Sequence, residues 1–168
     1  MIWRFIAAFV AVTAGAVAVY QVTRLSPAPD QPPMRLNHVG ISVANMEEAI
    51  DFYTKKMGYR LAFAIPDAPG QPRAVYLQVS RETFVELLTA TPARPAGFVH
   101  VGFEVDDMDG VAARLTRANV KVAQPRVGRT KATVAEVEVP DGVNVELLQF
   151  GPGSMQRKAM ESWPQPPR

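Results

Sequence analysis

The chain of 168 residues contains no cysteine and only two histidines. It can therefore form no disulfide, no thiolate zinc site, no cysteine nucleophile and no lipid-modified cysteine. It also lacks a basic stripe interleaved with aromatic residues, so we expect no nucleic-acid partner. The formal net charge of +2 belongs to the two ends, because residues 34–150 hold 13 basic and 14 acidic residues. With so few histidines, the positions of those two carry most of the information about chemistry.

The first 24 residues contain a long uncharged run, residues 5–23, behind the single cation Arg4. About 20 apolar residues in a helix span a bilayer core, so residues 2–22 can serve as a membrane anchor. Small residues at 14–18 also match a cleavage site, so a removed signal peptide fits equally well. Either alternative predicts a domain outside the cytoplasm, exported or anchored at the inner membrane, and periplasmic if the source is bacterial.

Proline marks both ends of the folded part. Residues 25–33 contain four prolines and predict an extended, semi-rigid linker. Residues 151–168 contain four more and predict a flexible tail, within which a short amphipathic helix can form at about residues 155–163. The fold must then be made by residues 34–150.

This folded part contains an internal duplication. The segment HVGISVANM that begins at His38 matches HVGFEVDDM that begins at His100, and VELL recurs around Glu86 and Glu146. The two offsets are 62 and 60 residues, which argues against chance. Two copies with a period near 60 do not fit the common solenoid repeats and indicate a duplicated module, residues 34–91 and 97–150.

Each module predicts one strand, one helix and three further strands. Alternation at 37–43 and 99–105 indicates half-buried first strands, and Asn45 and Asp107 are good N-caps for the apolar helical stripes that follow. The later strands are expected at 60–65, 74–79 and 83–88, and again at 121–123, 133–139 and 143–150. We therefore predict an α+β fold in which two tandem βαβββ modules form a curved mixed sheet around a cleft, with the helices outside.

Polar side chains gather on the sheet face that is predicted to line the cleft. His38 and Glu86 lie there in the first module, and His100 and Glu146 occupy the duplicated positions in the second. A pseudo-twofold axis between the modules would bring all four together, and such polar groups need water, a partner or a metal. Two imidazoles and two carboxylates suit a divalent ion such as zinc, nickel, cobalt, manganese or iron(II). The alternative is a decayed duplicate with a hydrated, metal-free cleft.

These residues resemble the vicinal oxygen chelate superfamily, which includes glyoxalase I, extradiol dioxygenases and bleomycin resistance proteins. The resemblance covers residues 35–150 and rests on LNHVGISVANMEEAIDFYTKKMGY, FVELL, FVHVGFEVDD and VPDGVNVELLQF. It implies that His38, Glu86, His100 and Glu146 are the metal ligands, a set similar to that of glyoxalase I. It further implies a divalent-metal-dependent lyase or isomerase that acts on a small molecule. In such an enzyme Glu146 or Glu86 would move a proton between adjacent carbons through a metal-bound enediolate.

Other members of the superfamily give the alternatives. A methylmalonyl-CoA epimerase-like enzyme fits the same residues equally well. A non-catalytic binding or resistance protein fits less well, because such relatives generally lack the metal residues. An extradiol dioxygenase uses a third histidine, which this chain lacks.

Two features depart from glyoxalase I. Ser42 stands where the first strand of that enzyme commonly has a basic residue for glutathione, and the leader suggests export away from the main glutathione pool. Four basic residues in loops near the expected cleft mouth can bind an anionic substrate or simply remain solvated: Arg73, Arg126, Arg129 and Lys131.

The family resemblance also implies a homodimer. The two modules can pair within one chain, or modules of two chains can pair and share each metal. The short connection between the modules, with Pro92 and Pro95, does not decide between these arrangements.

Overall fold

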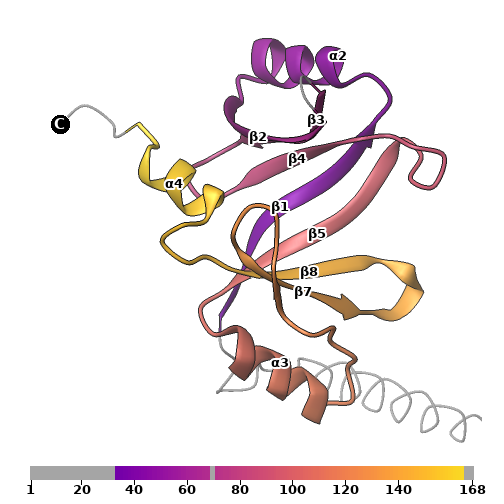
Figure 1. Cartoon of the computed structure of the whole chain (residues 1–168), viewed down its shortest axis with the longest axis vertical. Coiled ribbons are helices and arrows are strands. Elements are labelled where there is room, and N and C mark those ends of the chain that lie inside the picture. Colours follow the sequence, from indigo (N-terminus) through magenta and orange to yellow (C-terminus); the bar gives the residue numbers. More distant parts are fainter. Residues whose placement is uncertain (1–32, 69–70, 165–168) are drawn as a thin grey trace, which may run out of the picture. The chain divides into compact units, whose positions relative to one another are not determined.

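One curved eight-stranded sheet organises the described part of the chain, which in this computed structural model is residues 33–68 and 71–164 (Figure 1). The strand order is β2-β3-β4-β1-β5-β8-β7-β6. The strands are β1 (Met34–Val43), β2 (Arg60–Ala68), β3 (Gln71–Gln78), β4 (Phe84–Thr89), β5 (Gly97–Val105), β6 (Arg126–Val127), β7 (Thr133–Glu138) and β8 (Asn144–Gln149). The helices are α2 (Met46–Asp51), which continues into the π-helical turn η1 (Phe52–Lys56), α3 (Met108–Arg117) and α4 (Met155–Glu161), and Pro140–Gly142 form the short 3₁₀ turn η2.

The leader predicted at residues 1–24, and all but the last residue of the predicted linker, lie outside the described residues. Within the described ranges, no helix is both long enough and apolar enough to span a membrane.

Strand pairing confirms the prediction of two tandem modules. β1 pairs in parallel with β4, and β5 pairs in parallel with β8, so each module closes on its own first strand. The two first strands, β1 and β5, pair antiparallel at the centre of the sheet. A local twofold axis through this central antiparallel pair relates the two modules. Both modules belong to the same chain.

Local sequence signals place the ends of α2 and α3. The Asn45 side chain accepts a hydrogen bond from the Glu48 N–H at 3.2 Å, and Asp107 accepts one from the Gly110 N–H at 3.0 Å. These bonds satisfy amides that have no partner inside the helix. Gly58 and Asn119 follow the two helical segments with φ of 75° and 61°, the left-handed conformation that ends a helix.

Each helix covers its own half of the sheet on the outer face. Figure 1 shows α2 and α3 at opposite ends of the curved sheet. Under α2 the core contains Val75, Leu77 and Leu87, and under α3 it contains Val105, Met108, Val111, Ala135, Val137 and Leu147. The inner face is therefore left for the polar residues of the central strands.

The expected strand at residues 121–123 is wrong. Val122 makes only an isolated bridge to Val137, and the regular strand β6 lies further along, at Arg126–Val127. Pro125 separates the two stretches, and a proline has no N–H to donate to a ladder of strand hydrogen bonds. The extended segment therefore pairs with β7 in two short pieces rather than as one strand.

The short helix that the sequence allowed at about residues 155–163 is present, and it makes most of the region expected to be a flexible tail, residues 151–168, an ordered part of the domain. Residues 155–161 form α4, in which Gln156 and Ala159 are buried. The Met155 N–H donates to the Thr130 carbonyl at 2.9 Å, and the Arg60 guanidinium donates to the Ser162 carbonyl at 3.1 Å. A helix held to both modules cannot behave as a loose tail.

Candidate metal centre

The four candidate ligands lie on the four central strands of the sheet, all in one chain. His38 is on β1, Glu86 on β4, His100 on β5 and Glu146 on β8. The strand register arranges them in two rows. Glu86, Gly40 and His100 are neighbours across β4, β1 and β5, and Glu146, Gly102 and His38 are neighbours across β8, β5 and β1. The HVG motif of each module therefore places its histidine opposite the glycine of the other.

The two glycines leave room for the two imidazoles. A Cβ atom at Gly40 would lie 2.5 Å from Cε1 of His100, and a Cβ at Gly102 would overlap the ring of His38. A side chain at either position would displace the imidazole that crosses over it. The glycines therefore allow both rings to fold inward over the central strand pair and to meet.

The ligand atoms of three of the four residues, His38, Glu86 and His100, converge on one point, and Glu146 lies beside them. The Nε2 atoms of His38 and His100 are 2.8 Å apart, and Nε2 of His100 is 2.9 Å from Oε2 of Glu86. Nε2 of His38 is 3.7 Å from the nearer oxygen of both Glu86 and Glu146. Ligands about 2.1 Å from a common zinc-like ion are themselves about 3.0 to 3.5 Å apart. The spacing and the nitrogen and oxygen donors of His38, Glu86 and His100 thus fit a divalent ion.

Asn37 orients the more deeply buried histidine. Its amide nitrogen donates to the Glu82 carbonyl at 3.1 Å, which turns its amide oxygen toward Nδ1 of His38, 3.2 Å away. That oxygen can only accept, so Nδ1 carries the proton and Nε2 keeps its lone pair for the metal. Burial lowers the pKa of His38 to about 4, with Glu86 opposing and His100 adding to the effect. The ring is therefore neutral at pH 7, as a metal ligand must be.

The two glutamates differ in their environments. Burial acts to raise the pKa of Glu86, but the hydrogen bond from His100 and the charges of both histidines outweigh it, so this pKa is lowered. Burial raises the pKa of Glu146 to about 7, with the charge of His100 opposing and that of Glu86 adding. For His100, burial acts to lower the pKa, but the hydrogen bond and charge of Glu86 outweigh it and the net shift is upward.

The two modules differ in the residue that lies beside each glutamate. Tyr76 is the cross-strand neighbour of Glu86, and Glu136 is the corresponding neighbour of Glu146. Tyr76 is buried, with its ring stacked on Phe63 at a centroid distance of 4.5 Å. Glu136 instead lies at the surface and pairs with Arg126 at 2.5 Å. One glutamate thus has a phenol beside it and the other has a second carboxylate.

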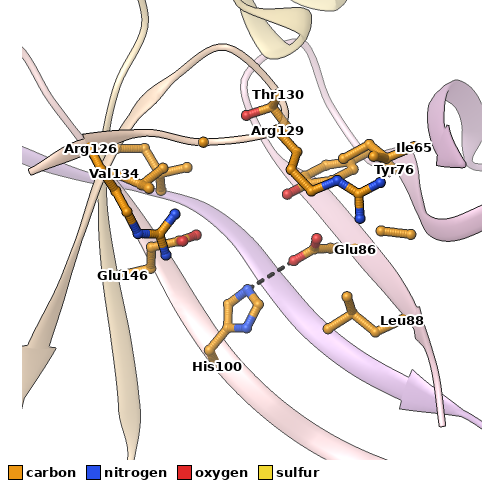
Figure 2. Close-up of a pocket in the computed structure, with 13 residues that line it drawn as sticks. Ile65, Tyr76, Glu86, Leu88, His100, Arg126, Arg129, Thr130, Val134 and Glu146 are labelled. Atoms are coloured by element: carbon orange, nitrogen blue, oxygen red, sulfur yellow. Dashed lines mark ion pairs between the residues drawn. The ribbon is translucent and has the colours of Figure 1, made fainter. Parts of the chain in front are cut away.

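A cavity of about 240 Å³ opens over this cluster (Figure 2). Figure 2 shows Glu86 and His100 facing one another at its base, with the Tyr76 hydroxyl directed toward Glu86 and Glu146 on the opposite side. Apolar side chains complete the wall: Ile65, Ala74, Leu88, Val134 and Leu148. A polar base under apolar walls suits a small organic molecule that presents oxygen atoms to a metal.

Several other polar residues of the sheet have separate roles. Ser42 donates to the Arg94 carbonyl at 3.2 Å, Glu104 pairs with Arg35 at 3.3 Å, and Glu138 pairs with Lys121 at 3.1 Å. Of the basic loop residues, Arg126 and Arg129 line the cavity, whereas Lys131 lines a separate groove beside α4. The side chain of Arg73 lies outside the described part.

Four further residues have roles that were not expected from the sequence: Asn37, Gly40, Gly102 and Gln156. The repeated HVG motif contained the signal for the glycines, because a glycine duplicated along with a ligand indicates a spatial requirement. No comparable signal marks Asn37, whose burial follows from a register shift of β1 between Leu36 and His38.

Comparison with known proteins agrees with this geometry. The family model described as Glyoxalase/Bleomycin resistance protein/Dioxygenase superfamily matches residues 35–147. A lactoylglutathione lyase of Neisseria meningitidis serogroup B is 29% identical over 126 residues, which cover 69% of this chain and 91% of that protein. A probable chloroplastic lactoylglutathione lyase of Arabidopsis thaliana is 31% identical over 127 residues, 70% of this chain and 36% of that protein. The crystal structure of methylmalonyl-CoA epimerase from Mycobacterium tuberculosis shares the fold, with a TM-score of 0.63, 24% identity, and coverage of 77% of this chain and 95% of that one.

Proposed function

Because the chain belongs to the glyoxalase/bleomycin resistance protein/dioxygenase superfamily, we propose that it is a divalent-metal-dependent lyase or isomerase of the glyoxalase I type. The observation that carries the proposal is the convergence of His38, Glu86 and His100 at ligand spacing, with Glu146 beside them. The lactoylglutathione lyases among its relatives favour the same reaction class.

The two glutamates take different roles in this proposal. Glu86 is a metal ligand, because it lies within hydrogen-bond distance of His100 and its lowered pKa keeps it ionised. Glu146 is the proton-transfer base. Its side chain is 23% exposed against 9% for Glu86, and its raised pKa, about 7, suits a group that accepts and returns a proton. Two neighbouring carboxyl groups with separated pKa values are typical of such a division of roles.

A divalent ion held by His38, His100 and Glu86 would polarise a substrate carbonyl and stabilise negative charge on its oxygen. Glu146 removes a proton from the carbon next to that carbonyl and returns it to the adjacent carbon, so the reaction is an isomerisation without oxidant or reductant. The apolar wall, including Leu88 and Leu148, excludes water that would compete for the proton.

Methylmalonyl-CoA epimerase-like proton transfer is the second candidate, because removal of the α-proton requires the same kind of base and the same polarised carbonyl, with a second group returning the proton on the opposite face. Structural neighbours of that name share the fold, at 24% identity or less in the examples compared. A non-catalytic binding protein is the third candidate, and the intact donor set argues against it.

The test is turnover of the methylglyoxal–glutathione hemithioacetal by protein loaded with zinc, nickel, cobalt or manganese, with Glu146→Gln and Glu86→Gln compared. We expect Glu146→Gln to keep the metal and to lose about 10²- to 10⁴-fold in kcat, the range for loss of a general base. Glu86→Gln should bind the metal more weakly than wild type, because the substitution removes a carboxylate ligand.

Two results would redirect the proposal. Wild-type protein that holds no metal after loading contradicts the enzyme assignment altogether. Metal-loaded protein that leaves the hemithioacetal unchanged, but exchanges the α-proton of methylmalonyl-CoA with deuterated water, supports the epimerase alternative.

A further inference from the structure

Helix α4 is an addition to the part of the chain that the family model matches, which ends at residue 147. It contacts both halves of the sheet on the inner side. Gln78 of β3 donates to the Ala159 carbonyl at 3.4 Å, and Met160 packs against a cluster from each half, one around Tyr76 and Phe84 and one around Val134 and Leu148. The helix therefore lies next to the residues that form the cavity wall.

Gln156 is the unusual residue of this helix. It is 0% exposed, and among the described residues no group makes a well-formed hydrogen bond to its amide nitrogen or its amide oxygen; the Tyr76 phenol is the polar group that interacts with it. A buried carboxamide without well-formed hydrogen bonds is costly and requires an explanation. Ala159, one turn further along the same buried face, packs in the cluster that contains Tyr76.

Tyr76 connects that carboxamide with the metal centre. It faces Glu86 directly across the β3–β4 pair, and Figure 2 shows its hydroxyl directed toward that carboxylate. Packing fixes the ring, which is stacked on Phe63 and edge-on to His38 at 5.8 Å. Burial raises the pKa of Tyr76 well above its usual value, the charge of Glu86 adds to this, and the neighbouring Gln156 carboxamide acts in the opposite direction.

We propose that Gln156 is a positioning residue for the metal centre, and that it acts through Tyr76. Its amide N–H donates to the phenol oxygen, and the phenol O–H then donates to Glu86 and holds that carboxylate toward His38 and His100. In this arrangement the buried carboxamide has a structural role, and α4 becomes part of the active site. The inference rests on the proposed function, since it assumes that Glu86 binds a metal.

The test is Co(II) binding by the full chain, measured for wild type, Gln156→Met and Tyr76→Phe. Loss of a group that holds a metal ligand in place typically weakens affinity about 10- to 100-fold. We expect both variants to raise the Kd for Co(II) at least about tenfold and to shift the visible absorption bands of the bound ion. The double variant should bind no more weakly than Tyr76→Phe, because Gln156 acts only through the phenol.

Thermal unfolding separates this role from a merely structural one. Methionine keeps nearly the same volume, and the lost bond to the phenol is offset by removal of a buried amide oxygen that has no partner, so Gln156→Met should leave the Tm nearly unchanged while it weakens Co(II) binding. Lys158→Met, on the exposed face of the same helix, is the matched control and should bind as wild type does.

The Co(II) binding measurements distinguish failure of this inference from failure of the proposed function. Wild type that binds no Co(II) overturns both this inference and the proposed function. If wild type binds but Gln156→Met binds equally well, the inference alone is overturned. Tyr76→Phe with wild-type affinity overturns it even if Gln156→Met fails to fold.

Discussion

Two glycines determine how closely the two histidines can approach. Gly40 and Gly102 sit opposite His100 and His38 in the β1–β5 register, and a Cβ at either position would occupy space that the facing imidazole fills. The duplicated motif is therefore reciprocal, because each module supplies one histidine and the space for the other module's histidine. This reciprocity gives a physical reason for glycine at the third position of both HVG motifs.

Alanine at Gly102 should damage the site more than alanine at Gly40. His38 is 1% exposed and has nowhere to move, whereas His100 is partly exposed and can swing toward the cavity. We expect Gly102→Ala to lower the free energy of unfolding by about 1 to 3 kcal/mol, the range for overpacking a core. It should also abolish tight metal binding.

Calorimetry and metal titration of Gly102→Ala, Gly40→Ala and a control variant would measure this difference. The control is Gly151→Ala, where an added Cβ would meet no atom within 4 Å, and it should change stability by less than about 0.5 kcal/mol. A Gly102→Ala protein as stable and as metal-competent as the control would show that the histidines do not need this close approach.

Metal affinity should depend on pH through the protons that an ion must displace. In the metal-free protein the pKa of Glu146 is raised to about 7 and that of His100 is also raised, so both groups are protonated on the acid side of neutrality. An incoming cation then displaces the proton of the ligand His100 and is attracted more strongly once the neighbouring Glu146 is ionised, so its affinity must rise as pH rises through about 7 and level off above. His38, neutral above about pH 4, adds nothing in this window.

Zinc titrations at half-unit steps from pH 5.5 to 8.5 would show this dependence, and calorimetry in two buffers would count the protons released. The Glu146→Gln variant should give a flatter profile. An affinity that does not change between pH 6 and pH 7 would contradict the account.

At the scale of elements, α4 should contribute to the stability of the whole domain. The helix is joined to the sheet by the packing of Ala159 and Met160 and by the hydrogen bonds from Arg60 to Ser162. A chain that stops after residue 153 should lose about 2 to 4 kcal/mol in its free energy of unfolding, as expected when a few apolar side chains are returned to water. Urea denaturation would measure the loss, and an unchanged midpoint would mean that residues 154–168 are a tail after all.

The sequence predicts those features that depend on nearby residues or on the duplication. Alternation gave the strands on which His38 and Glu86 lie, and the capping residues Asn45 and Asp107 start their helices as expected. A short helix was expected within the tail, but its packing on the sheet was not predictable, because its fully buried residues are Gln156 and Ala159, a polar and a small residue. The contact of Tyr76 with Glu86 depends on strand register, which forms between segments distant in the chain.

At the scale of the whole molecule, one chain contains the complete cluster of two histidines and two glutamates. β1 and β5 pair within the chain, so one chain can bring these side chains together without a second one, and a site shared between two chains stays an alternative. The expected homodimer stays a prediction, as does export by residues 1–24, and neither is needed to complete the site.

Mixing two inactive variants tests this arrangement. If each site lies within one chain, His38→Ala mixed with His100→Ala after unfolding and refolding together should recover no metal binding, because no chain has both imidazoles. In a shared site, a fraction of mixed dimers would hold one intact ligand set. Recovered binding, at any fraction of wild type, would therefore contradict the single-chain site.

The most direct test of the central claim is X-ray absorption spectroscopy on the zinc-loaded protein, with the metal content measured on the same sample. We expect one ion per chain, two imidazole ligands, and carboxylate oxygen in the remaining scattering at about 2.0 to 2.2 Å. Replacement of either histidine by alanine should remove one imidazole contribution or the metal itself. A spectrum without imidazole scattering, or full zinc content in the His38→Ala variant, would contradict the assignment of this cluster as a metal centre.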